Sequence, residues 1–251
     1  MRIPSDLAGV PDDAEVPRLV AALPGGDRAE AVWRNGEGGV TFRLPPAAGL
    51  PARHAKWQAA LTPIDLEDEA RRLAWAARHA PVPRVVGHVR DDDGEALVTE
   101  TLEGTSAVLP PWTAEPARTA RELGAALRRL HDALPVAECP WEWSTAARIA
   151  RVADASERAR LAAADPGPSR LVVCHGDACA PNTLLGEDGR ATAHVDLGAL
   201  GVGDPWADLA VLSMSTVWNY GEGFEDDVYA GYGAAPDRAR IAFFRDLWNA
   251  G

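Results

Sequence analysis

Lysine is almost absent from this sequence: 25 of its 251 residues are lysine or arginine, and Lys56 is the single lysine. Cysteine is also scarce, and the odd count of three indicates reduced thiols rather than a disulfide framework. No apolar run is long enough to span a membrane, and the first residues contain no apolar core of signal-peptide length. We therefore expect a cytoplasmic globular protein with no membrane partner.

The charge balance is strongly acidic, with a net charge of −12 at pH 7. Nucleic-acid binding needs basic patches, so this balance argues against a nucleic-acid partner. It would suit a polycationic partner through electrostatic steering, but acidity that only keeps the protein soluble explains it equally well. The hydrophobic content of 47% is ordinary for a globular enzyme of this length.

The most informative stretch reads His-Gly-Asp-Ala-Cys-Ala-Pro-Asn over residues 175–182, and Asp196 follows in the sequence Asp-Leu-Gly. An Asp with an Asn five positions later, and then a second Asp before Gly, is typical of a kinase catalytic loop. Asp177 could accept the proton of an attacking hydroxyl, while Asn182 and Asp196 hold Mg²⁺ against phosphates. The alternative is that Asp177 and Asn182 only cap turns. That alternative does not explain why a second acid follows at a strand end.

The local pattern supports this geometry. The apolar run 171–174 predicts a buried strand that leads into the loop. Residues 183–185 and 191–195 predict two further strands joined by the turn Gly-Glu-Asp-Gly, which is a hairpin signal. A tight hairpin would bring Asn182 and Asp196 together on one cation.

Lys56 is the second candidate site residue. In a chain this rich in arginine, a retained lysine suggests a position that needs a compact point charge. Kinases place such a lysine on a strand and pair it with a helical Glu, and Glu69 lies in a predicted amphipathic helix that begins near residue 65. The strand signal around residues 55–57 is weak, so an ordinary exposed lysine is the alternative.

Residues 172–185 and 195–210 resemble the aminoglycoside phosphotransferases, most of all the 3'-phosphotransferase (kanamycin kinase) branch. Looser similarity follows in chain order over 69–75, 79–86, 96–104 and 130–140. The resemblance extends from about residue 35 to the C-terminus. It implies an ATP- and Mg²⁺-dependent kinase that phosphorylates a hydroxyl of an aminoglycoside and so confers antibiotic resistance, acting as a monomer or weak dimer.

The resemblance also implies roles for individual residues. Asp177 would be the catalytic base, and Asn182 and Asp196 would be the Mg²⁺ ligands. Lys56 would contact the α- and β-phosphates of ATP and pair with Glu69.

Further roles concern the nucleotide and the loop. Backbone groups of Thr99 and Thr101 would hold adenine, and the turn with Gly36, Gly38 and Gly39 would cover the phosphates. That turn lacks a complete G-x-G-x-x-G, so it could equally be a plain hairpin turn. His175 would brace the catalytic loop, and Asp208 would cap a helix and bond the same loop. Cys174, His175 and Cys179 could also be considered as zinc ligands, but the sequence offers no fourth ligand at a suitable spacing, which argues against a zinc site.

Departures from the family pattern concern the acceptor. Ala199 stands where the branch has an Arg, Asn249 where an acid is expected, and Gly251 where the branch ends in an aromatic residue. The segment 139–171, which supplies further acids in the family, is short. We therefore expect complete phosphoryl-transfer machinery with an eroded aminoglycoside grip. The alternatives are a kinase for another hydroxylated metabolite or antibiotic, and a non-catalytic nucleotide-binding homologue.

The expected fold is α/β (α+β): a two-lobed, protein-kinase-like fold with a small β-rich N-lobe and a larger helical C-lobe. We place the N-terminal nucleotide-binding lobe at 1–98, the hinge at 99–104 and the C-terminal catalytic and acceptor-binding lobe at 105–251. In the C-lobe the pattern predicts helices from Pro116 to about 134, over 145–164, and near 205–214, 225–232 and 236–248.

Overall fold

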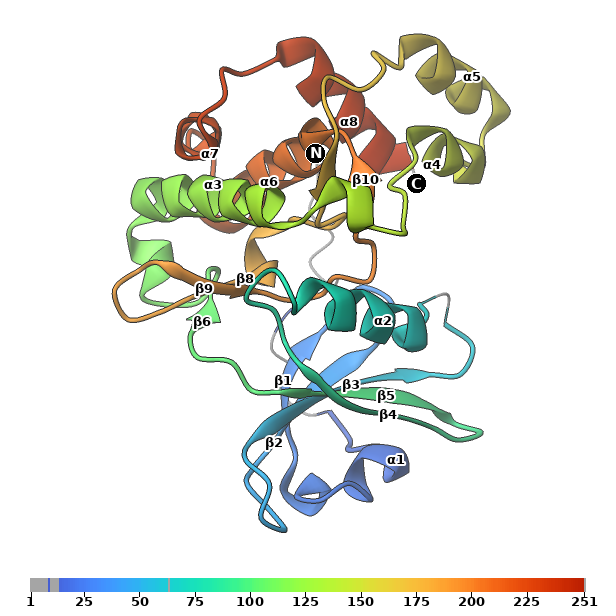
Figure 1. Cartoon of the computed structure of the whole chain (residues 1–251), viewed down its shortest axis with the longest axis vertical. Coiled ribbons are helices and arrows are strands. Elements are labelled where there is room, and N and C mark those ends of the chain that lie inside the picture. The colour runs from blue at the N-terminus through green and yellow to red at the C-terminus, as the bar shows by residue number, and fades with distance from the viewer. Residues whose placement is uncertain (1–8, 10–13, 63, 251) are drawn as a thin grey trace. The chain divides into compact units, whose positions relative to one another are not determined.

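The structure is a computed structural model that describes residues 9, 14–62 and 64–250 (Figure 1). The chain divides into two compact units. The first unit comprises Met1–Arg78 with Val82–Leu102, and the second comprises His79–Pro81 with Glu103–Gly251.

An antiparallel five-stranded sheet forms the body of the first unit, in the order β1-β2-β3-β5-β4. Its elements are α1 (Arg18–Ala21), η1 (Gly26–Arg28), β1 (Glu30–Arg34), β2 (Val40–Leu44), β3 (Arg53–Ala59), α2 (Leu66–Ala76), β4 (Val85–Arg90) and β5 (Gly94–Glu100). Alternate residues of β2, including Phe42 and Leu44, are fully buried and pack with Val20 of α1. Period-2 burial of this kind is the reason an apolar strand face holds its register.

Helix α2 is tied to the sheet at its N-terminus. The carboxylate of Asp65 accepts a hydrogen bond from Asp68 N at 2.9 Å and caps the helix. Leu66 N donates to the buried carboxylate of Glu95 on β5 at 3.2 Å. Both contacts satisfy backbone donors that a helix leaves free in its first turn, so the position of α2 against the sheet is fixed.

The second unit is mainly helical and carries two small sheets. Its helices are α3 (Pro116–Ala133), α4 (Thr145–Arg151), α5 (Ala155–Ala164), α6 (Pro205–Tyr220), α7 (Glu225–Tyr232) and α8 (Arg238–Ala250), with 3-10 turns η2 (Trp112–Ala114), η3 (Val136–Glu138) and η4 (Ala180–Asn182). Strand β7 (Val172–Cys174) pairs with β10 (Gly201–Gly203), and β6 (Thr105–Ser106), β8 (Thr183–Leu185) and β9 (Ala191–His194) form the other sheet. Among the described residues, none of the helices has the length and apolar character needed to cross a membrane.

Helices α3 and α7 approach each other backbone to backbone. A Cβ added at Gly124 would lie 2.0 Å from Val228 O, and one added at Gly231 would lie 1.9 Å from Arg121 O. Only glycine fits at such distances. This contact places the C-terminal turn of α7 beside residues 121–124, near the middle of α3.

Two expectations about helices of the second unit are wrong. The predicted helix over 145–164 is two helices, α4 and α5, because the helical conformation is interrupted at residues 152–154. Asp154 accepts a hydrogen bond from Glu157 N at 2.7 Å and so caps α5. The cap of α6 is Asp204, which accepts from Trp206 N at 2.8 Å, and not Asp208, which lies inside the first turn.

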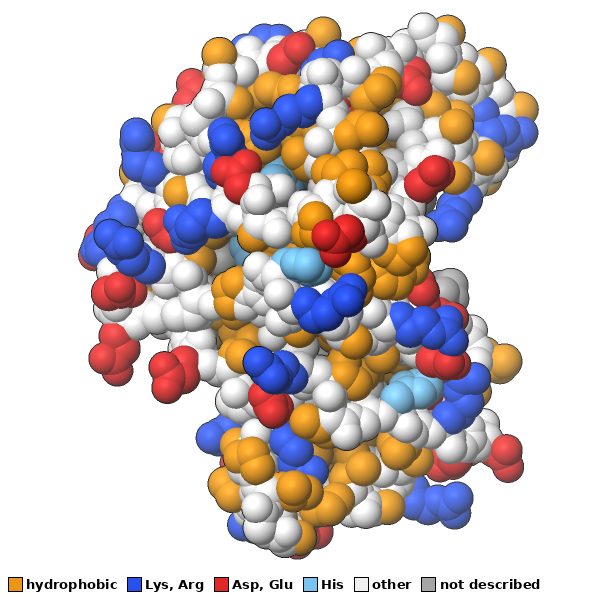
Figure 2. Space-filling model, viewed as in Figure 1, with side chains coloured by type: hydrophobic (Ala, Val, Ile, Leu, Met, Phe, Trp, Pro, Cys, Tyr) orange, Lys and Arg blue, Asp and Glu red, His pale blue; other side chains and the backbone are white. Residues whose placement is uncertain are grey.

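Charged side chains of both signs are interspersed over the face shown in Figure 2. Many form short-range pairs within one helix. Arg128 lies 2.7 Å from Asp132, and Arg118 lies 3.0 Å from Glu115. Exposed pairs of this type contribute little to stability, but they neutralise much of the local charge.

Candidate active site

The catalytic-loop motif is held together by the amide of Asn182. Its Nδ2 donates to Asp177 O at 2.9 Å and to Asp177 Oδ2 at 3.2 Å. The hairpin of β8 and β9 pairs Thr183 with His194, and Val195 N donates to Asn182 O at 2.9 Å. The structure therefore brings Asp177 and Asn182 into contact, and it places Asp196 at the end of the strand beside Asn182.

Asp196 has a left-handed backbone conformation, with φ of 62°. Asp tolerates this region better than most residues, but the conformation is still costly and is concentrated at functional sites. Burial raises the pKa of Asp177, and the carboxylate of Asp196 raises it further. The two carboxylates therefore lie close enough to repel each other in a poorly solvated place.

The residues present fit a divalent cation. Asp177 Oδ1 is buried and has no hydrogen-bond partner in the described part of the chain. Because Asn182 donates its Nδ2 to Asp177, the oxygen of the same amide is the atom available to a cation. Mg²⁺ takes oxygen ligands, usually one or two carboxylates completed by phosphates and water. The described residues contain no group of three or more His, Cys, Asp or Glu placed to hold a metal ion.

His175 braces the loop from inside. Its Nε2 donates to Val195 O at 3.0 Å, and its Nδ1 accepts from Asp177 N at 3.3 Å. A carbonyl on one side and an N–H on the other require the neutral ring with its proton on Nε2. His175 thereby links the loop of Asp177 to the strand that leads into Asp196.

The carboxylate of Asp208 holds the backbone at the start of the same loop. Its carboxylate accepts from His175 N at 2.6 Å and from Gly176 N at 2.9 Å, and it is 1% exposed. His131 Nε2 donates to it at 2.9 Å. Burial raises the pKa of Asp208, but the hydrogen bonds from His131 and from the backbone hold it below its usual value. Asp208 is therefore an ionised anchor for the backbone just before Asp177.

The hydrogen-bond chain continues beyond Asp208. His131 Nδ1 lies 2.8 Å from the hydroxyl of Tyr232, and Arg170 Nη2 donates to that hydroxyl oxygen at 2.6 Å. Because Asp208 can only accept, His131 keeps its proton on Nε2 and Tyr232 donates to Nδ1. Each group in this hydrogen-bond chain therefore donates to the next one, in the order Arg170, Tyr232, His131 and Asp208.

The sequence alone did not predict this chain of hydrogen bonds. Family resemblance indicated Asp208 and the segment 130–140, which contains His131, whereas Tyr232 and Arg170 carry no local signal. The four residues are separated by as many as 101 positions, and they meet only because α3, α6, α7 and the segment before β7 pack together.

In the first unit, Lys56 Nζ lies 2.7 Å from Glu69 Oε2. The side chain of Glu69 is 3% exposed and that of Lys56 is 15% exposed. A nearly buried carboxylate beside the one lysine fixes the ammonium group at the end of its flexible stem. The structure therefore places these two predicted residues in contact, while their role on phosphate stays a prediction.

The glycine-rich segment is a tight turn between β1 and β2. The side chain of Asn35 accepts from Gly39 N at 2.7 Å and from Glu37 N at 3.1 Å, and Gly38 has a positive φ of 83°. Two backbone donors that could face phosphates are thus used by Asn35. Gly36 lies in the same turn, and the phosphate-covering role of the three glycines stays a prediction.

The residues predicted to hold adenine lie at the end of β5. Thr99 pairs with His54 on β3 and with Val85 on β4. Thr101 follows the strand, and its N donates to Ala52 O at 3.4 Å. Thr99, Thr101, the glycine turn and the pair Lys56–Glu69 all belong to the first unit, whereas Asp177, Asn182 and Asp196 belong to the second.

The cysteines around the loop are in the thiol form. Burial raises the pKa of Cys174 and Cys179 well above the usual value, and nearby carboxylates raise it further. A protonated thiol is neither a nucleophile nor a metal ligand.

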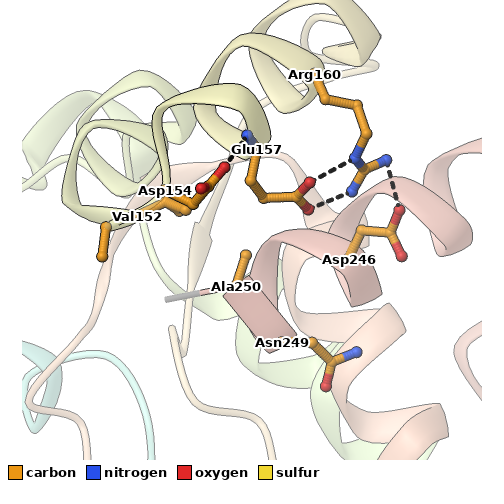
Figure 3. A pocket seen from close by; sticks show the side chains of 8 residues that line it. Val152, Asp154, Glu157, Arg160, Asp246, Asn249 and Ala250 are labelled. Atoms are coloured by element: carbon orange, nitrogen blue, oxygen red, sulfur yellow. Dashed lines mark hydrogen bonds and ion pairs between the residues drawn. The ribbon is translucent and has the colours of Figure 1, made fainter.

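A separate pocket of about 440 Å³ lies between α5 and α8 (Figure 3). Its charged or polar lining residues are Asp154, Glu157, Arg160, Asp246 and Asn249. Sequence reasoning found Asn249 but not the three acids, because they lie on two helices some ninety positions apart.

With this geometry in view, comparison with known proteins defines the class. The sequence matches the phosphotransferase enzyme family over residues 20–244, and the chain belongs to that family. The predicted resemblance and the protein-kinase-like fold are confirmed.

The chain is 36% identical to an aminoglycoside 3'-phosphotransferase of Streptomyces fradiae, covering 73% of this chain and 79% of that protein. It is 35% identical to a streptomycin 3''-kinase of Streptomyces griseus, covering 86% and 90%. The solved structure of the aminoglycoside phosphotransferase APH(3'')-Id from Streptomyces rimosus is 31% identical, with a TM-score of 0.70 and coverage of 91% and 94%. A structure of that protein contains ADP and streptomycin.

Proposed function

We propose that this protein transfers the γ-phosphoryl group of ATP to a hydroxyl group of an aminoglycoside, and that it thereby confers antibiotic resistance. The observation that carries the proposal is the contact of Asp177 with Asn182 beside Asp196, in a chain of the phosphotransferase family. The relatives named above support the aminoglycoside as acceptor.

The reaction needs few groups from the protein. Asp177 accepts the proton of the acceptor hydroxyl and aligns its oxygen with the γ-phosphorus. The new O–P bond forms as the bond from the γ-phosphorus to the β-phosphate oxygen breaks, and ADP leaves. Positioning and charge neutralisation supply most of the acceleration in such transfers.

The nucleotide is held by groups of the first unit. Lys56, fixed by Glu69, binds the α- and β-phosphates. The glycine turn at 36–39 covers the phosphates, and backbone groups at Thr99 and Thr101 bind adenine. We assign 1–98 as the nucleotide-binding lobe, 99–104 as the hinge and 105–251 as the catalytic and acceptor-binding lobe.

Asn182 and Asp196 are the residues that would hold Mg²⁺. Bound there, the ion neutralises charge on the phosphates. The proposal includes a cytoplasmic location, because ATP is found there, and a monomer or weak dimer.

The pocket between α5 and α8 is the acceptor site in this proposal. Its carboxylates Asp154, Glu157 and Asp246 would attract the cationic groups of an aminoglycoside. The relatives act at 3' and 3'' positions with nearly equal identity to this chain, so the hydroxyl is identified by NMR of the phosphorylated product.

A second candidate is a kinase for another hydroxylated compound. Asn249 in place of an acid, and Ala199 in place of Arg, favour it.

ADP release with Mg-ATP and a panel of kanamycin, neomycin and streptomycin tests the proposal, with Asp177→Asn as the control. We expect aminoglycoside-dependent release that the variant lacks. Release with none of the aminoglycosides, but with another hydroxylated acceptor, would favour the second candidate.

A further inference from the structure

The guanidinium group of Arg160 forms part of the lining of the acidic pocket and pairs with two of its carboxylates. Arg160 Nε and Nη2 donate to the two carboxylate oxygens of Glu157 at 2.8 and 2.6 Å. Its Nη1 lies 3.0 Å from Asp246 Oδ2 (Figure 3). A single side chain of α5 therefore pairs with one carboxylate on its own helix and with another on α8.

These contacts are the ones a cationic ligand would make. A carboxylate that accepts two parallel N–H bonds from a guanidinium keeps free lone pairs, but its negative charge is already neutralised by that group, so it attracts a further cation less strongly. Asp154, the remaining acid of the lining, accepts from Ser156 Oγ at 2.6 Å and from Glu157 N at 2.7 Å, so it is used as the cap of α5. All three carboxylates of the pocket thus have a partner before any ligand arrives.

The Arg160 pairs are nevertheless accessible to water. The side chains of Arg160 and Asp246 are each 49% exposed, and that of Glu157 is 34% exposed. Ion pairs in such surroundings are weak, and the long arginine stem can turn toward solvent. A ligand with several positive charges can therefore displace Arg160, whereas a ligand with one charge gains too little.

We propose that Arg160 is a specificity-determining residue that competes with the acceptor for Glu157 and Asp246. It raises the KM for cationic acceptors and selects those with several positive charges. This inference rests on the proposed function. If Arg160 only braces α5 against α8, its removal would loosen the pocket and raise the KM instead, so the two roles predict opposite signs.

The test compares Arg160→Gln with the matched variant Arg118→Gln in the full-length protein. Arg118 also pairs with a glutamate three positions earlier and is 63% exposed, so its loss changes the net charge equally. We expect the acceptor KM of Arg160→Gln to fall about three- to tenfold at low salt, with kcat and the KM for ATP unchanged. The difference should shrink at high salt, because exposed charges are screened. Arg118→Gln should leave the acceptor KM unchanged.

An unchanged or higher acceptor KM in Arg160→Gln, relative to Arg118→Gln, would overturn the inference. If Arg160→Gln does not fold, Arg160→Lys takes its place in the test. It keeps the charge but loses the two-pronged contact, so its KM should fall in the same direction by a smaller factor. A wild-type protein inactive on every aminoglycoside would contradict the proposed function, whereas an active one with an unmoved KM in both variants contradicts only the role of Arg160.

Discussion

The second unit contains two acidic centres that differ in almost every physical respect. At the catalytic loop, Asp208 is 1% exposed and accepts hydrogen bonds from two backbone N–H groups and a histidine. In the pocket, Asp246 is half exposed and meets one movable guanidinium. A reaction that depends on sub-ångström alignment needs carboxylates that cannot rearrange. Recognition of a charged molecule from water needs carboxylates that can exchange partners, and each centre has the surroundings that suit its proposed task.

The sharpest test of this contrast is Asp177→Asn. We expect kcat to fall by about two to four orders of magnitude, because the amide cannot accept the proton, while the KM for ATP stays the same. Steady-state kinetics with Mg-ATP and an aminoglycoside measure both. Stability should not fall, because burial and Asp196 raise the pKa of Asp177 and ionised Asp177 therefore disfavours the folded state. Unchanged turnover would remove Asp177 from the role of base.

Acid should destabilise the buried centre through His194. Burial lowers the pKa of His194 to about 3. Below about pH 6.5 the unfolded chain binds a proton that the folded chain refuses, so stability falls as the pH drops toward 3. Between pH 6.5 and 5 the loss from this group approaches roughly 2 kcal/mol. Urea unfolding of wild type and His194→Gln checks it, and an equal pH slope in both would contradict the assignment.

The hydrogen-bond chain behind Asp208 can be cut at one atom. Tyr232→Phe removes the hydroxyl that bonds His131 Nδ1, so the ring loses one of the two hydrogen bonds that fix its orientation toward Asp208. We expect kcat to fall about tenfold, with both KM values within twofold, a difference of about 1.4 kcal/mol in the transition state. Tyr229→Phe is the matched control, because Tyr229 lies on the same helix but donates to Ser213 Oγ at 2.7 Å. Equal kinetics in the two variants would show that the chain does not act on the loop.

The smallest expected effect is in the exposed pocket. Asn249→Asp adds a carboxylate to its lining, so the acceptor KM should fall about two- to fivefold at low salt and by less at high salt. kcat should not change, because a carboxylate that contacts only the cationic groups of the acceptor stabilises its ground state and its transition state equally. A drop in kcat comparable to that of Tyr232→Phe would mean that the two centres are not separate in function.

The same contrast explains what the sequence could predict. The loop of Asp177 and Asn182 lies within eight consecutive residues, and a short hairpin leads to Asp196, so local patterns were sufficient. Lys56 was conspicuous because arginine had replaced every other lysine. These features gave the fold class, which comparison with known proteins confirmed.

Features made by packing were beyond local patterns. The break between α4 and α5 was missed because the segment is rich in Ala and Arg, which favour helix throughout, and Asp154 could equally have been a surface residue of one long helix. The acids of the pocket come from two helices, and the partners of Asp208 come from α3 and from the loop. No spacing in the chain links them.

The close backbone contact between α3 and α7 makes this enzyme sensitive to substitution of Gly124 and Gly231. Tyr232 is carried by α7 and His131 by α3, so the gap between the two backbones sets the length of their 2.8 Å hydrogen bond. A single methyl group at position 124 or 231 would push the helices apart by more than such a bond tolerates. A substitution at either glycine, which belongs neither to the residues proposed to bind the nucleotide nor to the acceptor pocket, is therefore expected to slow the enzyme.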